Sequence, residues 1–182
     1  MENPTWTPTP AMDAMTAIRT RRSVRAYTDQ DVTEAQVKEL LGAAMSAPSA
    51  CNEQPWEFVV IRDKETLNNV AGLNQFAEFA KNAPVSILVC GNLNHDKCGG
   101  YWVEDVSAAT QNMLLAAHAM GLGAVWTGIY PLEDRIHGFR ELIGAPQYII
   151  PFALVVIGYP KKSPEPVDRF NAGRIHQDRW TA

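Results

Sequence analysis

The sequence has few cysteines and no long apolar segment. Its three cysteines, Cys51, Cys90 and Cys98, form an odd count without the close spacing of a disulfide framework, so we do not expect a disulfide-stapled secreted domain. The longest apolar run, residues 148–159, is broken by a proline and a glycine and is shorter than the ~20 residues that span a bilayer. The N-terminus is polar and proline-rich, unlike a secretory signal peptide. We therefore expect a soluble cytoplasmic protein with no membrane partner.

Several catalytic and cofactor motifs are also absent. There is no P-loop and no Gly-x-Ser-x-Gly nucleophile elbow. Gly121 and Gly123 resemble half of a dinucleotide fingerprint, but they lead from a helix to a strand, so a helix C-cap is the favoured interpretation. Cys90, His95 and Cys98 have the spacing of a partial metal site without a suitable fourth ligand, so we predict no metal.

Length and charge limit the class of protein. The 182 residues are 46% hydrophobic and 20% charged, which predicts one globular domain over residues 1–182. Sixteen basic and twenty acidic side chains give a net charge of −4, which argues against a broad nucleic-acid-binding surface. A small, local basic pocket is still compatible with this balance.

Hydrophobic periodicity and capping residues predict helices that alternate with strands. The best-marked helix starts at Thr33, where Gln36 completes a capping box, and ends before Pro48. The other expected helices are residues 10–19, 64–71, 101–120 and 132–143, and the expected strands are 58–61, 85–90, 124–127 and 152–157. This alternation predicts a three-layer α/β or α+β domain.

The longest predicted helix and the C-terminal segment indicate an obligate homodimer. Residues 101–120 are apolar on more than one side, which favours burial against a second surface. The segment after residue 160 is polar and irregular, yet it carries three large apolar side chains: Phe170, Ile175 and Trp180. We expect a core over about residues 13–160 and an arm over residues 161–182 that packs on the partner subunit.

Two loops carry the candidate chemistry. Arg21, Ser23 and Arg25 share one face if the chain is extended there, and guanidinium groups match phosphate oxygens. The loop of residues 47–56 combines small residues with amide side chains that can bind the edge of a heterocycle. Taken alone, a solvated basic turn and an ordinary loop with Trp56 in the core stay open as alternatives.

Several segments resemble, in order along the chain, the FMN-dependent nitroreductase family and its short-chain branch. They are residues 21–27, 47–56, 108–117, 121–126, 158–160 and 174–180, and the resemblance extends over about residues 13–180. It implies an α+β fold with a central, mostly antiparallel mixed sheet flanked by helices. It also implies a domain-swapped homodimer with two FMN molecules at the interface.

The resemblance implies a role for each matching position. The phosphate and ribityl contacts would be Arg21, Arg22 and Ser23, with Arg169 or Arg174 as a late phosphate contact, and the spacing favours Arg169. Arg25 would lie at the pyrimidine edge of the flavin and tune it. The residues beside flavin N5 and O4 would be Thr127, Gly128 and Ile129. The loop presented by the other subunit would comprise Pro48, Ser49, Ala50, Cys51, Asn52 and Gln54, with Cys51 where the family often has Ser or Thr.

The implied activity is ping-pong transfer of hydride from NAD(P)H through flavin N5 to nitroaromatics, quinones or enones. The flavin would carry the redox chemistry, and no acid–base side chain is expected. The alternatives are a flavin store or sensor without turnover, a dehalogenase-like or flavin-destroying branch of the same family, and a non-flavin α/β binding domain.

Overall fold

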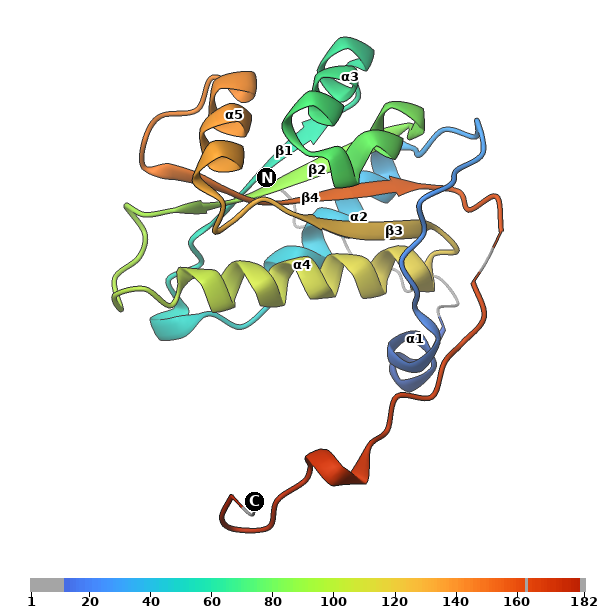
Figure 1. Cartoon of the computed structure of the whole chain (residues 1–182), viewed down its shortest axis with the longest axis vertical. Helices are drawn as coiled ribbons and strands as arrows, with labels where there is room; N and C mark the ends of the chain where they lie inside the picture. The colour runs from blue at the N-terminus through green and yellow to red at the C-terminus, as the bar shows by residue number, and fades with distance from the viewer. Residues whose placement is uncertain (1–11, 163, 181–182) are drawn as a thin grey trace, which may run out of the picture.

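The computed structural model describes residues 12–162 and 164–180, and they form one antiparallel sheet between two layers of helices (Figure 1). The helices are α1 (Ala14–Thr20), α2 (Glu34–Met45), α3 (Lys64–Leu73), α4 (Trp102–Ala119) and α5 (Glu133–Ile143). Three 3-10 segments are η1 (Ala50–Asn52), η2 (Gln75–Asn82) and η3 (Ala172–Arg174). The strands are β1 (Trp56–Ile61), β2 (Val85–Asn92), β3 (Gly123–Gly128) and β4 (Ile149–Gly158).

The sheet has the strand order β1-β2-β4-β3, and each neighbouring pair is antiparallel. Helices α2 and α4 cover one face, while α3, η2 and α5 cover the other (Figure 1). Alternate residues of β2 serve the two layers, because Ile87 and Val89 pack toward α4 whereas Leu88 and Cys90 pack toward α3 and α5. Burial on both faces explains why β2 and β4 are nearly continuous apolar runs. The predicted α+β fold is confirmed.

Local signals fix most element ends as the sequence predicts. The hydroxyl of Thr33 accepts from the Gln36 N–H at 3.2 Å, and the Gln36 amide oxygen accepts from the Thr33 N–H at 2.9 Å, which completes the capping box of α2. Helix α5 ends at Gly144, whose φ of 64° suits a residue without a side chain. Helix α1 starts later than predicted, because Asp13 caps it, and the predicted start at residue 10 lies outside the described residues.

The chain beyond β4 leaves the body of the domain and runs past α1 to a distant C-terminal end (Figure 1). Phe170 and Trp180 are 76% and 82% exposed, and Ile175 is also exposed. Side chains of this size usually have an apolar partner surface. The structure thus leaves these three apolar side chains of the predicted arm exposed, and the homodimer stays a prediction.

Candidate functional site

The arginine segment, residues 21–25, runs extended from the end of α1 across the start of β3. The Val24 N–H donates to the Ala124 carbonyl at 3.1 Å, and Ser23 forms a parallel bridge with Ala124. The close approach needs a glycine at position 123, since a Cβ there would lie 2.7 Å from a Val24 methyl group. Sheet contacts therefore hold the backbone of this segment and leave the side chains of Ser23 and Arg25 exposed.

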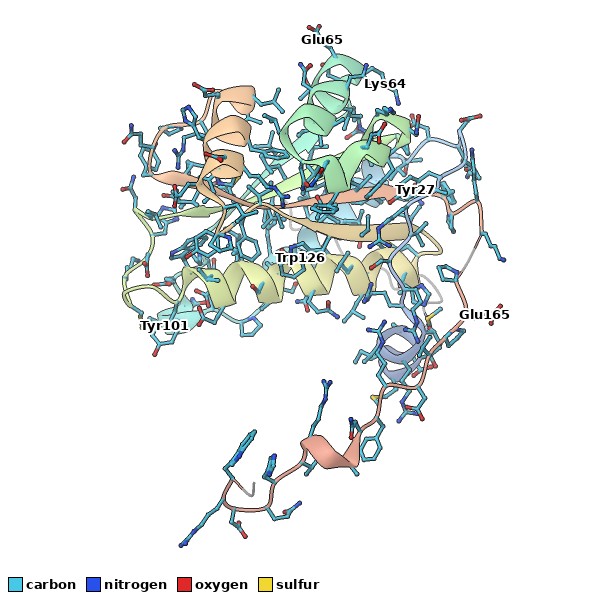
Figure 2. The ribbon with its side chains drawn as sticks, in the orientation of Figure 1. Tyr27, Lys64, Glu65, Tyr101, Trp126 and Glu165 are labelled. Atoms are coloured by element: carbon cyan, nitrogen blue, oxygen red, sulfur yellow. A yellow bond between two sulfur atoms is a disulfide. The ribbon has the colours of Figure 1, made fainter. Side chains whose placement is uncertain are left out.

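A tyrosine closes the far end of the arginine segment. The buried hydroxyl of Tyr27, beside the end of β4 in Figure 2, lies 2.5 Å from the Val24 carbonyl and 3.0 Å from the Val156 carbonyl. One acceptor belongs to the arginine segment and the other to β4. Tyr27 thus fixes the segment to the sheet, a role that the sequence analysis does not assign.

A cavity of about 750 Å³ lies between the arginine segment and the C-terminal arm. Its walls are residues 18–22 and 166–170, so it brings Arg21 and Arg169 together. Burial, followed by the charges of Arg22 and Arg169, lowers the pKa of Arg21. Arg174, the other candidate for a late phosphate contact, does not line this cavity.

The cations of this cavity lack anionic partners on the described chain. No ion pair to Arg21, Arg22 or Arg169 is formed within residues 12–162 and 164–180. Arg22 instead donates to main-chain carbonyls, among them Val167 in the arm at 2.8 Å. Its Nε is buried and has no hydrogen-bond partner in the described part of the chain. Unpaired, partly desolvated guanidinium groups make this cavity suited to an anion such as a phosphate.

The loop of residues 47–56 is the second predicted half of the site. Its turn places Cys51, Asn52 and Gln54 at φ values of 49°, 52° and 48°, the left-handed region that residues with a Cβ rarely adopt. The Gln54 N–H donates to the Ser49 hydroxyl at 3.0 Å, and its side-chain amide donates to Asn52 at 3.0 Å. Trp56 is buried in the core, as the alternative interpretation of this loop proposed.

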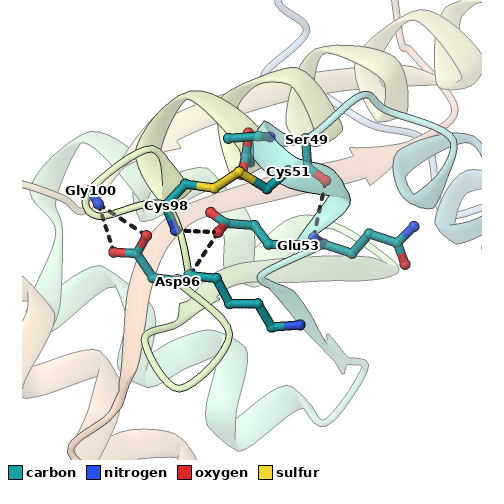
Figure 3. Close-up of a disulfide and its surroundings, with 10 residues drawn as sticks. Ser49, Cys51, Glu53, Asp96, Cys98 and Gly100 are labelled. Atoms are coloured by element: carbon teal, nitrogen blue, oxygen red, sulfur yellow. Dashed lines mark hydrogen bonds between the residues drawn. A yellow bond between two sulfur atoms is a disulfide. The ribbon is translucent and has the colours of Figure 1, made fainter.

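The structure corrects the expectation for the cysteines, because Cys51 and Cys98 form a disulfide (Figure 3). The bond joins the η1 loop to the loop between β2 and α4, across a sequence separation of 47 residues. Cys90 is a free thiol in β2, and burial raises its pKa to about 12. Cys90, His95 and Cys98 therefore do not form a metal-binding cluster in the described residues, because Cys98 pairs with Cys51.

Two buried carboxyl groups beneath the disulfide are the residues that the sequence analysis misses. An oxygen of Glu53 accepts from the N–H groups of Lys97 and Cys98 at 2.7 and 3.0 Å. An oxygen of Asp105 in α4 accepts from the Ala50 N–H at 2.9 Å. The second oxygen of each carboxyl group is buried without a hydrogen-bond partner in the described residues, and burial, with a smaller contribution from Glu53, raises the pKa of Asp105. A buried glutamate in the loop gives no sequence signal, because its partners lie more than 40 residues away.

The third predicted segment, residues 127–129, offers mainly its backbone. The side chains of Thr127 and Ile129 are buried, and the Thr127 hydroxyl donates into β4 at 3.0 Å. The exposed Gly128 has its carbonyl held by the Arg135 guanidinium at 2.9 Å and by the Asn74 amide at 3.3 Å. Only Gly128 therefore presents an open main-chain surface to a ligand.

The two halves of the predicted site lie at opposite ends of α4 in one chain (Figure 1). Ala50 is anchored to Asp105 near the first end, and Thr20 lies 2.8 Å from the His118 ring nitrogen near the other. His118 lies thirteen positions after Asp105 in α4, a distance of about 20 Å at 1.5 Å per residue. The loop and the arginine segment of one chain are therefore too far apart to hold the same small group together.

Comparison with known proteins places this architecture in a family. The model of the Nitroreductase family matches residues 18–84 and 74–159. The chain belongs to the nitroreductase family. It is 47% identical, over 93% of its length and 88% of the relative, to a Methanothermobacter thermautotrophicus protein provisionally named NADH dehydrogenase/NAD(P)H nitroreductase.

Solved structures of this nitroreductase family share the fold. An FMN-dependent nitroreductase from Clostridium difficile has a TM-score of 0.84 at 27% identity, covering 91% of this chain and 99% of its own. A Desulfovibrio desulfuricans protein, described as a nitroreductase in complex with FMN, has a TM-score of 0.80 at 32% identity, with coverage of 96% and 100%. The predicted family is confirmed, and with it the prediction that the chain is an oxidoreductase. Among the described residues, no helix is long and apolar enough to cross a membrane.

Proposed function

We propose that this nitroreductase-family chain binds FMN, takes electrons from NAD(P)H and reduces small electron-poor acceptors such as nitroaromatics and quinones. The observation that carries the proposal is the cavity lined by Arg21 and Arg169, two cations without a carboxylate partner in the described chain. The unpartnered Nε of Arg22 adds a buried donor there. This donor set fits the phosphate of FMN, and the names of the relatives support FMN as cofactor and NAD(P)H as electron donor.

The separation of the two halves supports a site shared between two subunits. Two copies packed with their α4 helices antiparallel would bring the η1 loop of one to the arginine segment of the other. This pairing is isologous, so it closes as a dimer with two equivalent sites. It would also offer a surface to Phe170 and Trp180 of the arm, and we expect an interface above ~2,000 Å² in total.

Each part of the chain has a distinct task in the proposed reaction. When bound, FMN supplies the hydride chemistry between donor and acceptor. Arg21 and Arg169 hold its phosphate, and Ser23 adds a hydroxyl on the same side. Gly128 lets its main chain approach the ring closely, since no side chain intervenes. Arg25, exposed at the end of the segment, supplies positive charge beside the ring.

Turnover and cofactor content test the proposal together. The purified protein should be yellow, and it should oxidise NADH or NADPH steadily when menadione or a nitrofuran is added. A flavin store or sensor would be yellow without turnover, and a dehalogenase-like enzyme would act on a halogenated phenol but not on menadione. A colourless protein that gains no flavin on reconstitution would overturn the proposal.

A further inference from the structure

The Cys51–Cys98 disulfide lies at the surface, in the loop that the proposed function places against FMN (Figure 3). Cys51 is exposed and Cys98 is half-buried, so the more accessible sulfur is that of Cys51. Cys90, in contrast, lies inside the sheet with no exposed surface. Reagents in solution can therefore reach the disulfide while the remaining thiol is protected.

The disulfide ties down a strained turn. Cys51, Asn52 and Gln54 all have left-handed backbone conformations, which bring Cβ close to the following carbonyl and are unfavourable for residues other than glycine. Local hydrogen bonds hold part of this turn, such as that from the Gln54 N–H to the Ser49 hydroxyl. The disulfide adds a covalent tie from Cys51 in this turn to the loop between β2 and α4.

The base of the loop is anchored without the disulfide. Asp105 holds the Ala50 N–H, and Glu53 holds the N–H groups of Lys97 and Cys98 on the opposite side. Both carboxyl groups are buried, and their bonds to main-chain N–H groups keep the two loops adjacent whether or not the sulfurs are joined. Cleavage of the sulfur–sulfur bond should therefore release the tip of the turn and leave the fold intact.

We propose that the Cys51–Cys98 disulfide is a thiol–disulfide exchange site for low-molecular-weight thiols and dithiols, and that its redox state sets the conformation of residues 49–54. The effect on the cofactor rests on the proposed function, because that function makes these residues part of the FMN site. The exchange itself does not depend on FMN.

The exchange balances with two thiols as the reductant. A thiolate attacks Sγ of Cys51 and forms a mixed disulfide, and the Cys98 sulfur leaves as a thiolate that takes a proton from solvent. A second thiolate then attacks the sulfur of the bound reagent, which frees Cys51 as a thiolate that is also protonated. The two reagent thiols are oxidised to one disulfide, and the protein disulfide is reduced to two thiols.

Thiol counting on the native protein tests the exchange. The protein purified without reductant should contain one alkylatable thiol per chain after denaturation, Cys90, and three after incubation of the native protein with millimolar reduced glutathione. Mass spectrometry should assign the two new labels to Cys51 and Cys98. A disulfide that survives native incubation with both glutathione and dithiothreitol, or cysteines that stay free under oxidised glutathione, would overturn the proposal.

Hydrogen exchange tests the conformational part. The amides of residues 51–54 should exchange about tenfold or more faster after reduction, while those of β2 and β4 keep their rates. The double variant C51S/C98S should match the reduced protein and ignore the reductant, whereas C90A should respond to it like the parent. Equal rates in the two redox states would contradict the coupling of the loop to the disulfide.

A cofactor titration separates this inference from the proposed function. The dissociation constant of FMN should differ about fivefold or more between the two redox states of the parent and not in C51S/C98S. A protein that binds no FMN would refute the proposed function, while thiol counting and hydrogen exchange would still decide the exchange site. Equal FMN affinity in both states would refute the link from the disulfide to the cofactor.

Discussion

The arginine segment and the η1 loop are held by opposite means. Around Arg21 the chain gathers cations that repel one another, and none of Arg21, Arg22 and Arg169 forms an ion pair within the described residues. Around Glu53 it buries two acidic groups, holds one oxygen of each with main-chain N–H groups and adds a disulfide. The first region needs an anion to balance its charge, whereas the second is tied together by hydrogen bonds and a covalent bond within the chain. Changes in the first should therefore alter cofactor binding, and changes in the second should alter stability and loop conformation.

Among changes to the arginine segment and its surroundings, removal of the arm should have the largest effect on FMN binding and dimerisation. A chain that ends after Pro166 lacks Arg169 and the Val167 carbonyl that accepts from Arg22, and it lacks the apolar residues proposed to bury on the partner. We expect weaker dimerisation and loss of FMN together, because a site shared between subunits links the two equilibria. Light scattering and flavin absorbance on the same sample measure both. A truncated chain that still dimerises and keeps its flavin would contradict the assignment of cofactor binding to the arginine segment and the arm.

Arg21→Ala should weaken FMN binding without harming the fold. Loss of one charge-assisted contact costs roughly 1.5–3 kcal/mol, or about ten- to a hundredfold in affinity. The melting temperature of the flavin-free protein should not fall, because the lowered pKa of Arg21 reflects burial and repulsion. Flavin fluorescence titration gives the affinity, and Arg174→Ala is the matched control because Arg174 lies outside the cavity. If R174A weakens binding as much as R21A, the assignment of Arg169 is wrong.

Asp105→Asn, at the anchor of the η1 loop, should raise the stability of the protein at neutral pH. Asn keeps an oxygen for the Ala50 N–H, removes the charge of a buried carboxyl group and adds N–H donors beside Glu53, whose Oε1 has no partner in the described residues. We expect a gain of about 1 kcal/mol, or roughly 2–4 °C in melting temperature, at neutral pH. Asp105→Ala, which offers neither group, should instead lower the melting temperature.

The pH dependence of that gain follows from the direction of the Asp105 shift. Burial raises the pKa of Asp105 above its usual value of 3.8, and Glu53 adds to this while the Ala50 N–H opposes it. The native state therefore holds the proton more tightly than the unfolded chain. This contribution to stability is complete below pH 3.8 and is lost as the pH rises through the native pKa. The advantage of D105N should thus shrink on acidification, and a constant advantage in thermal melts across this range would argue against a raised pKa of Asp105.

Arg25→Met should give the smallest change. Arg25 is exposed, so solvent screens its charge and its effect on the flavin should stay below ~1 kcal/mol, or about 20 mV for two electrons. The midpoint potential should fall by this amount and reduction by NAD(P)H should slow slightly, with the melting temperature unchanged. Spectroelectrochemistry with Arg25→Lys as the charge-conserving control measures it. An increase in the potential of R25M would exclude the proposed tuning.

Sequence patterns predict the parts of this molecule that depend on near neighbours. The capping box of Thr33 and Gln36 and the apolar runs of β2 and β4 locate helices and strands to within a few residues. The resemblance names the arginine segment and the loop, and the structure places Arg169 near Arg21, while the role of Arg169 as a phosphate contact stays a prediction.

The pairings that sequence patterns miss join distant residues. Cys51 meets Cys98 and Glu53 meets Asp105 only because the sheet brings the two loops together, and no local rule encodes such a meeting. The 3-10 segment η2 is missed for a different reason. Its tight turns lack the 3.6-residue periodicity by which a helix is recognised.

The length of α4 restricts how this protein can change. A residue inserted between Asp105 and His118 would move the two anchor points apart by about 1.5 Å and rotate one against the other by about 100°. The loop at one end and the arginine segment at the other would then face different directions, and neither could be realigned without displacing the sheet beneath. The helix between the two anchors can therefore vary in residue type but not in length.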